Sequence, residues 1–249
     1  MNNKERVAKR QLRKVRGWTI FGILVGIAVL VIVALKAPAF NVTGYEIEGN
    51  HYYSDDEIIN MGNCNTGENI FTGVDCGDIR DRLMKDPYMV QVKVRRKIPN
   101  TIVVNITERA QVAGVVFGES FVVIDSDGIV LRKTTVDPKV TVLRGMNISK
   151  MELGEPIEVE EPVLLRQCMD MISTMQANNM YFKSITISEG EVKAYVLDSL
   201  VVRGMADNIL ESLKNKDIQL VVQELFEQGI ERGTIKVTGD NYVSFTPQI

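Results

Sequence analysis

One cluster of acidic residues could in principle provide paired carboxylates for acid–base chemistry. Asp55, Asp56 and Glu57 directly follow Ser54. Ser54 and Glu57 have the spacing of a capping box, and carboxylates in the first turn stabilise the positive end of the helix dipole. Paired catalytic carboxylates need a cleft and separate supports. The pattern therefore predicts a helix over 54–62 and not a catalytic site.

A second acidic stretch, Asp125-Ser-Asp-Gly128, begins like a calcium-binding loop. Such a loop also needs later oxygen ligands and a bidentate Glu at its twelfth position, and the chain has neither. Asp-Gly between two alternating apolar runs is typical of a tight hairpin. We therefore expect a turn here and no calcium site.

Other reactive side chains are few, with one histidine and three cysteines in 249 residues. His51 has no nucleophile signature around it, and the absence of C-x-x-C makes a zinc site improbable. The chain has no G-x-S-x-G, no P-loop and no dinucleotide-binding glycine motif. We expect no metal, no cofactor, no small-molecule substrate and no enzymatic activity.

The cysteines leave two alternatives open. Cys64 and Cys76 are close enough in sequence to form one possible disulfide outside the cytoplasm, which loop closure would make worth about 3 kcal/mol. Three cysteines are too few for a disulfide framework and are odd in number. Three free thiols are the alternative that we favour.

The most apolar stretch is Trp18–Leu35, which holds no charged residue. Its 18 residues would span about 27 Å as a helix, close to the thickness of the bilayer core. Basic residues precede it, which predicts a cytoplasmic tail over 1–17, a transmembrane helix over 18–36 and an extracytoplasmic remainder. A cleaved signal peptide ending at Ala37-Pro38-Ala39 and a buried core helix are the alternatives.

Charge divides unevenly along the chain. Eight of the 29 Lys and Arg residues but only one of the 32 Asp and Glu residues precede residue 37, which leaves 21 basic residues against 31 acidic ones. Phosphate binding requires a basic face. The composition therefore excludes nucleic acid as the expected partner of the remainder.

The residues that follow predict a first module of one strand, two helices and two strands. Period-two alternation marks the strands, and apolar spacing with capping residues marks the helices. Two helices on one face of a three-stranded sheet can bury a core of this size. The predicted elements are strand 42–47, helix 54–62, helix 76–85 capped by Asp75, strand 89–96 and strand 101–107.

A second module begins near Val115, after a boundary at 108–114. Its elements mix alternating strands with two amphipathic helical stretches. We expect a hairpin around Asp127-Gly128, a strand at 141–145, a helix at 161–178, a meander at 185–203, a long helix at 206–228, and two strands, 234–238 and 242–245, joined by a turn at 239–241.

Several of these stretches resemble one family of bacterial proteins. The chain carries F-x-V-x-x-Y-x-I-x-G-N-x-x-x-S-x-x-E-I-I at 40–59, G-E-N-I-F at 67–71, V-x-V-R-R-K-I-P-N-T-I-V-V-N-I-T-E-R at 92–109 and Y-V-S-F-T-P at 242–247. In this combination the chain resembles the FtsQ/DivIB cell-division proteins over residues 1–247. The resemblance implies an α+β fold in which a POTRA domain (β-α-α-β-β, 40–109) and a mixed α/β "β domain" (113–247) follow the membrane helix.

The resemblance also implies a function. Proteins of this family are non-enzymatic divisome scaffolds at the septum that bind small bitopic partners of the DivIC/FtsB and FtsL types. Binding adds a partner strand to the C-terminal edge, here 234–245. The implied contact residues are Ile235, Val237, Tyr242 and Phe245, flanked by Leu225 and Phe226. Strand alternation should turn half of the strand side chains toward the core. An extracytoplasmic POTRA chaperone or transport-assembly factor is the alternative.

Overall fold

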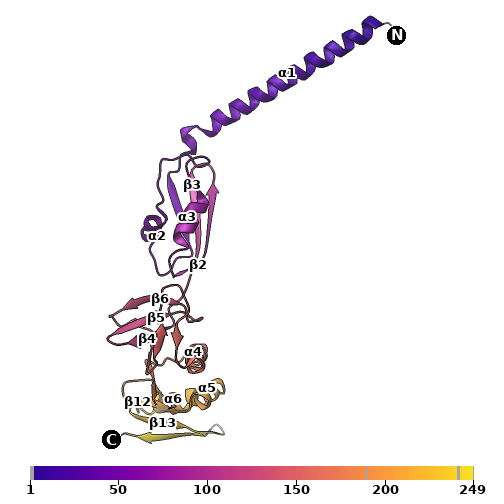
Figure 1. Cartoon of the computed structure of the whole chain (residues 1–249). Coiled ribbons are helices and arrows are strands. Elements are labelled where there is room, and N and C mark those ends of the chain that lie inside the picture. The colour runs from indigo at the N-terminus through magenta and orange to yellow at the C-terminus, as the bar shows by residue number, and fades with distance from the viewer. Residues whose placement is uncertain (1–2, 189, 240–241, 249) are drawn as a thin grey trace. The chain divides into compact units, whose positions relative to one another are not determined.

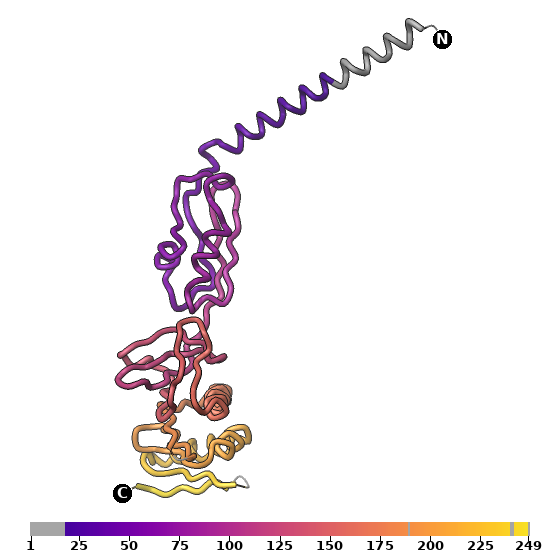
Figure 2. Tube along the Cα trace, viewed as in Figure 1, coloured from indigo at the N-terminus to yellow at the C-terminus, as the bar shows by residue number. Residues whose placement is uncertain are grey.

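The computed structural model describes residues 3–188, 190–239 and 242–248 (Figures 1 and 2). The chain divides into two compact units. Unit 1 comprises Met1–Lys85 and Gln91–Glu108, and unit 2 comprises Asp86–Val90 and Arg109–Ile249. Each unit is described by itself.

The first element of unit 1 is the long helix α1 (Asn3–Leu35). Its segment Trp18–Leu35 has a mean hydropathy of 2.8 and is long and apolar enough to cross a membrane. None of this segment is buried against protein, unlike the core helix of a soluble protein. The side chains of the predicted tail, 1–17, lie outside the described part of the structure.

The folded part of unit 1 has, among its described residues, a three-stranded sheet with the order β1-β3-β2 and two helices. Its elements are β1 (Gly44–Glu48), α2 (Asp55–Gly62), α3 (Cys76–Leu83), β2 (Met89–Lys97) and β3 (Thr101–Glu108), with a 3₁₀ turn at Pro38–Phe40. β1 pairs in parallel with β3. Ser54 and Glu57 form the predicted capping box, and Asp75 caps α3.

The described part of unit 2 has a nine-stranded mixed sheet, here called the large sheet, with the order β14-β13-β12-β11-β10-β7-β4-β5-β6. Its strands are β4 (Ala113–Phe117), β5 (Ser120–Ile124), β6 (Val130–Thr134), β7 (Thr141–Arg144), β10 (Ser184–Ser188), β11 (Glu191–Tyr195), β12 (Leu200–Gly204), β13 (Gly233–Val237) and β14 (Val243–Pro247). A small two-stranded sheet pairs β8 (Ile148–Lys150) with β9 (Glu158–Val159).

Three helices contribute to the core of unit 2 together with the large sheet. They are α4 (Pro162–Ala177), α5 (Ala206–Lys214) and α6 (Asp217–Glu227) (Figure 1). Alternate side chains along the strands pack with the helices in one apolar cluster. The side chains between them point toward the opposite face of the sheet. The fully buried members of the cluster include Leu143, Ile185, Ala194, Val202 and Ile235 from the strands, and Met171, Ile172, Ile209 and Ile218 from the helices.

One sequence prediction for unit 2 was wrong, and three strands were not predicted. The single helix predicted over 206–228 is two helices, because Lys216 adopts a left-handed backbone conformation with a φ of 67°. A right-handed helix cannot continue through such a residue. The strand β4 and the β8–β9 pair were not foreseen, and Gly118, with a φ of 59°, provides the turn between β4 and β5.

Candidate functional site

The C-terminal edge of the large sheet is formed by β14. In the part of the chain that the structure describes, β14 pairs only with β13, antiparallel, with Ile235 opposite Phe245 and Lys236 opposite Ser244. The turn predicted at 239–241 includes two residues outside the described part. An edge strand of this kind can accept a further strand through its main chain.

The backbone groups that face outward can be identified from two hydrogen bonds. The N–H of Thr238 donates to the carbonyl of Tyr242 at 3.0 Å, and the N–H of Gly233 donates to the carbonyl of Ser199 at 2.9 Å. Backbone groups of an antiparallel strand alternate between its two sides. The N–H and C=O groups of Val243 and Phe245 therefore point away from β13, toward the open edge.

Three of the six predicted contact residues cannot offer their side chains to a partner. Ile235, Val237 and Leu225 are 0%, 2% and 6% exposed and belong to the core of unit 2. Ile235 and Val237 lie on the inward face of β13, and Leu225 lies on the inward face of α6. The sequence prediction named all six residues and expected half of the strand side chains to face the core, without saying which half.

The other three predicted residues do reach the surface. Tyr242 is 65% exposed and Phe226 is 45% exposed. Phe245 is half-buried, and its ring lies against Gly233, where an added Cβ would clash with the ring. Phe245 therefore holds β14 against β13 as well as lining the edge.

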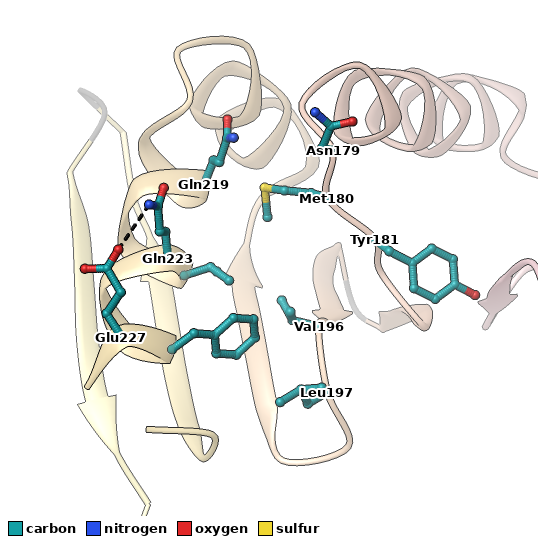
Figure 3. Close-up of a pocket in the computed structure, with 10 residues that line it drawn as sticks. Asn179, Met180, Tyr181, Val196, Leu197, Gln219, Gln223 and Glu227 are labelled. Atoms are coloured by element: carbon teal, nitrogen blue, oxygen red, sulfur yellow. Dashed lines mark hydrogen bonds between the residues drawn. The ribbon is translucent and has the colours of Figure 1, made fainter. Parts of the chain in front are cut away.

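An apolar groove of about 640 Å³ opens beside α6, and sequence reasoning did not find it (Figure 3). Its floor and walls come from one face of α6, the segment after α4 and the turn after β11. Phe226 belongs to the lining, together with Asn179, Met180, Tyr181, Val196, Leu197, Gln219, Val222, Gln223 and Glu227. Apolar residues in loops, such as Leu197, are the signal that could have indicated it.

Polar groups border this groove without forming a catalytic set. Gln223 donates from Nε2 to Oε1 of Glu227 at 3.1 Å (Figure 3). The Oε1 atom of Gln219 is buried and has no hydrogen-bond partner among the described residues. Burial, together with the charge of Asp137, raises the pKa of Tyr181, so its phenol stays protonated. The groove suits apolar side chains of a bound segment, with amide groups at its border.

The reactive residues considered from the sequence have structural partners instead. The backbone N–H groups of His51 and Tyr52 both donate to Oε2 of Glu108 at 2.6 Å. Asp125 accepts the N–H groups of Asp127 and Ile129 through Oδ1 and pairs with Arg109 at 2.5 Å through Oδ2. The Asp125 carboxylate is thus already bonded to backbone groups of its own hairpin and to Arg109.

The possible disulfide is not formed in the structure. Cys64, Cys76 and Cys168 are all free thiols, of which Cys64 and Cys168 are buried. Within the part of the chain that the structure describes, no group of three or more His, Cys, Asp or Glu side chains could hold a metal ion.

Comparison with known proteins finds one matching domain family and several similar proteins. Residues 40–109 match the family described as "POTRA domain, FtsQ-type". The chain is 29% identical to the cell division protein DivIB of Clostridium acetobutylicum, over 81% of this chain and 82% of that protein. The chain is similar to cell-division proteins of the FtsQ/DivIB type. The cell division protein DivIB of Clostridium tetani is 26% identical over 88% of this chain and 83% of its own length.

More distant relatives carry the same kind of name. DivIB of Bacillus subtilis is 23% identical over 86% of this chain and 81% of its own length. The solved major extracytoplasmic domain of DivIB from Geobacillus stearothermophilus is 15% identical, with a TM-score of 0.31 over 47% of this chain and 96% of that domain. Similarity to proteins named for cell division supports a division-related role for this chain.

Proposed function

We propose that the protein is a membrane-anchored, non-enzymatic scaffold of the division machinery that captures a partner strand along β14. The observation that carries this proposal is the open edge, where the backbone groups of Val243 and Phe245 have no strand beside them in the described part of the chain. Main-chain hydrogen bonds would supply affinity, and alternate side chains of the added strand would supply selectivity.

The proposed partners are bitopic division proteins of the DivIC/FtsB and FtsL types. Exposed Tyr242 and half-buried Phe245 border the edge, and the groove that Phe226 lines provides an apolar surface on the side of the sheet that α6 covers. A partner that contributes a strand and an adjoining apolar segment would use both features. Aromatic side chains are common anchors in such interfaces.

The proposed placement is a single pass through the membrane at the septum. The tail 1–17 lies in the cytoplasm, the helix 18–36 spans the bilayer, and the POTRA domain (40–109) and the β domain (113–247) lie outside. Support comes from the apolar, unburied segment Trp18–Leu35 and from the basic residues that precede it.

The test is a proline at an outward-facing position of β14. Val243→Pro removes one outward N–H and leaves the bonds to β13 made by Ser244 and Thr246. Val243→Ala, which keeps that N–H, is the matched control. With full chain and DivIC/FtsB-type partner reconstituted in nanodiscs, we expect the proline variant to weaken binding at least tenfold and the alanine variant less than threefold.

Equal binding by both variants would contradict strand addition at β14. Circular dichroism and thermal unfolding show whether each variant retains its fold. A fluorescent fusion of the full chain tests the wider role, because a division scaffold should concentrate at midcell. Even distribution around the envelope would instead indicate a chaperone or transport factor.

A further inference from the structure

Four cations lie in one row on the face of the large sheet opposite its helices. Residues paired across neighbouring strands are aligned along a line perpendicular to those strands. From β7 to β14 the row consists of Arg144, Thr186, Lys193, Arg203, Lys236 and Ser244. We call these six residues the cationic row. Six strands at about 4.8 Å spacing make it roughly 24 Å long.

The side chains of the cationic row point away from the core. Their direct neighbours along the strands, such as Leu143, Ala194 and Ile235, are fully buried against the helices. Arg144, Arg203 and Lys236 are exposed, and Lys193 is partly exposed. Three of the four cations are therefore exposed to solvent, and Lys193, Thr186 and Ser244 are partly exposed.

Glu191 is an acidic residue beside the cationic row, and it neutralises only part of the positive charge of the row. Glu191 accepts a hydrogen bond from Nε of Arg203 at 2.7 Å, and its Oε2 atom also forms an ion pair with Nη2 of Arg203 at 2.6 Å. This hydrogen bond lowers the pKa of Glu191, and the charges of Arg203, Lys193 and Lys236 lower it further. Like charges directly opposite each other destabilise a sheet. An anionic ligand would relieve this repulsion.

From this arrangement we propose that the cationic row binds a linear, phosphate-rich polyanion that crosses the strands. Charge complementarity selects an anionic ligand, although residues 37–249 as a whole are acidic. The hydroxyls of Thr186 and Ser244 add donors of the kind that contact phosphate oxygens. A ligand that follows the row meets all four cations.

The direction of the row distinguishes this ligand from a peptide strand. A strand added to β14 runs along the edge and meets the row only at Ser244. An acidic peptide strand therefore leaves Arg144, Lys193 and most of the row unused. Apart from Ser244, the polyanion site lies away from the edge that the proposed scaffold function uses, and it does not depend on that function.

The experiment measures binding of linear inorganic polyphosphate to the full chain in non-ionic detergent. Lys193→Ser/Lys236→Ser removes two cations of the row, and Lys133→Ser/Lys214→Ser removes two cations elsewhere in unit 2. We expect the first double variant to raise the dissociation constant at least tenfold and the second less than threefold. The slope of log affinity against log salt should become less steep by roughly 1.4 in the first variant alone.

Several results would overturn the proposal. These are no polyphosphate binding by the unaltered chain, equal weakening in the two double variants, or equally tight binding of polyglutamate of the same charge, which would assign the row to acidic peptides. Thermal unfolding checks the fold of each variant. If the serine variant unfolds, Lys193→Gln/Lys236→Gln replaces it, with the same tenfold expectation.

Discussion

Burial divides the three cysteines into two unreactive thiols and one accessible thiol. Burial raises the pKa of Cys64 to about 11 and that of Cys168 to about 12. The thiolate is the nucleophile, so both react slowly near neutral pH. Cys76 is partly exposed at the start of α3.

We predict that iodoacetamide at pH 8 modifies one thiol of the folded chain, at Cys76. After unfolding in guanidinium, all three thiols should be modified, because burial no longer suppresses thiolate formation at Cys64 and Cys168. Intact mass and peptide mapping give the count and the sites. A chain that takes up only one label after unfolding, and three after reduction, would instead hold a Cys64–Cys76 disulfide.

Phe226 is an exposed apolar residue of α6 that lines the groove. We predict that Phe226→Ala weakens binding of the proposed partner about tenfold, since an aromatic anchor in a pocket commonly contributes 1 kcal/mol or more. Leu220→Ala is the control, because Leu220 is 64% exposed on the same helix and does not line the groove. Similar losses in both variants would speak against the groove as a docking site.

At the level of elements, the junction between α5 and α6 depends on one strained residue. Lys216 has a φ of 67°, which costs a non-glycine residue roughly 1–2 kcal/mol. We predict that Lys216→Gly raises the free energy of unfolding by about 0.5–1 kcal/mol, after allowing for the greater freedom of glycine in the unfolded chain.

Chemical denaturation of the two variants Lys216→Gly and Lys214→Gly checks this prediction. Lys214 lies in the last turn of α5, where glycine should lower stability by up to about 1 kcal/mol. Opposite signs at two lysines only two residues apart would identify the backbone conformation as the cause. The same sign at both positions would contradict it.

The elements of unit 1 could be predicted well from sequence because their signals are local. The capping residues Ser54 and Asp75 and the period-two runs at 89–107 depend on near neighbours only. The left-handed Lys216 carries no such signal, because glycine or asparagine is the usual residue in that conformation. The sequence pattern therefore predicts a single helix from 206 to 228.

The candidate site was predictable only in part for a related reason. Alternation indicated that half of the residues of β13 and β14 face inward, but it could not say which half. Burial shows that Ile235 and Val237 face the core, and the exposed Lys236 between them faces solvent. The groove was missed because its walls come from segments that only the tertiary fold brings together, such as Tyr181 and Gln223.

For the whole molecule, the apolar segment 18–35 fixes the expected topology. We predict that protease added to intact spheroplasts degrades the chain after about residue 36 and spares an N-terminal tag, because the bilayer shields the cytoplasmic tail. Immunoblots against the tag and against unit 2 report both ends. Loss of the tag in intact spheroplasts would contradict a cytoplasmic N-terminus.

The mass of the purified mature protein separates the anchor from the signal-peptide alternative. An anchored chain keeps its N-terminal residues, whereas cleavage after Ala39 would leave a chain that begins at Phe40. Detection of that shorter chain as the main product would contradict a permanent anchor.

The position of β7 has a consequence for how unit 2 folds. This four-residue strand alone joins β4 to β10 in the described large sheet, and both of its pairings are parallel. Ala113 pairs with Thr141, 28 residues later, and Val142 pairs with Ser184, 42 residues later. Closing such loops is slow compared with forming the local hairpins on either side. Pairing of the two halves of the large sheet therefore depends on β7. We expect a mutation that weakens the pairing of β7 to slow completion of the sheet, whose far edge is β14.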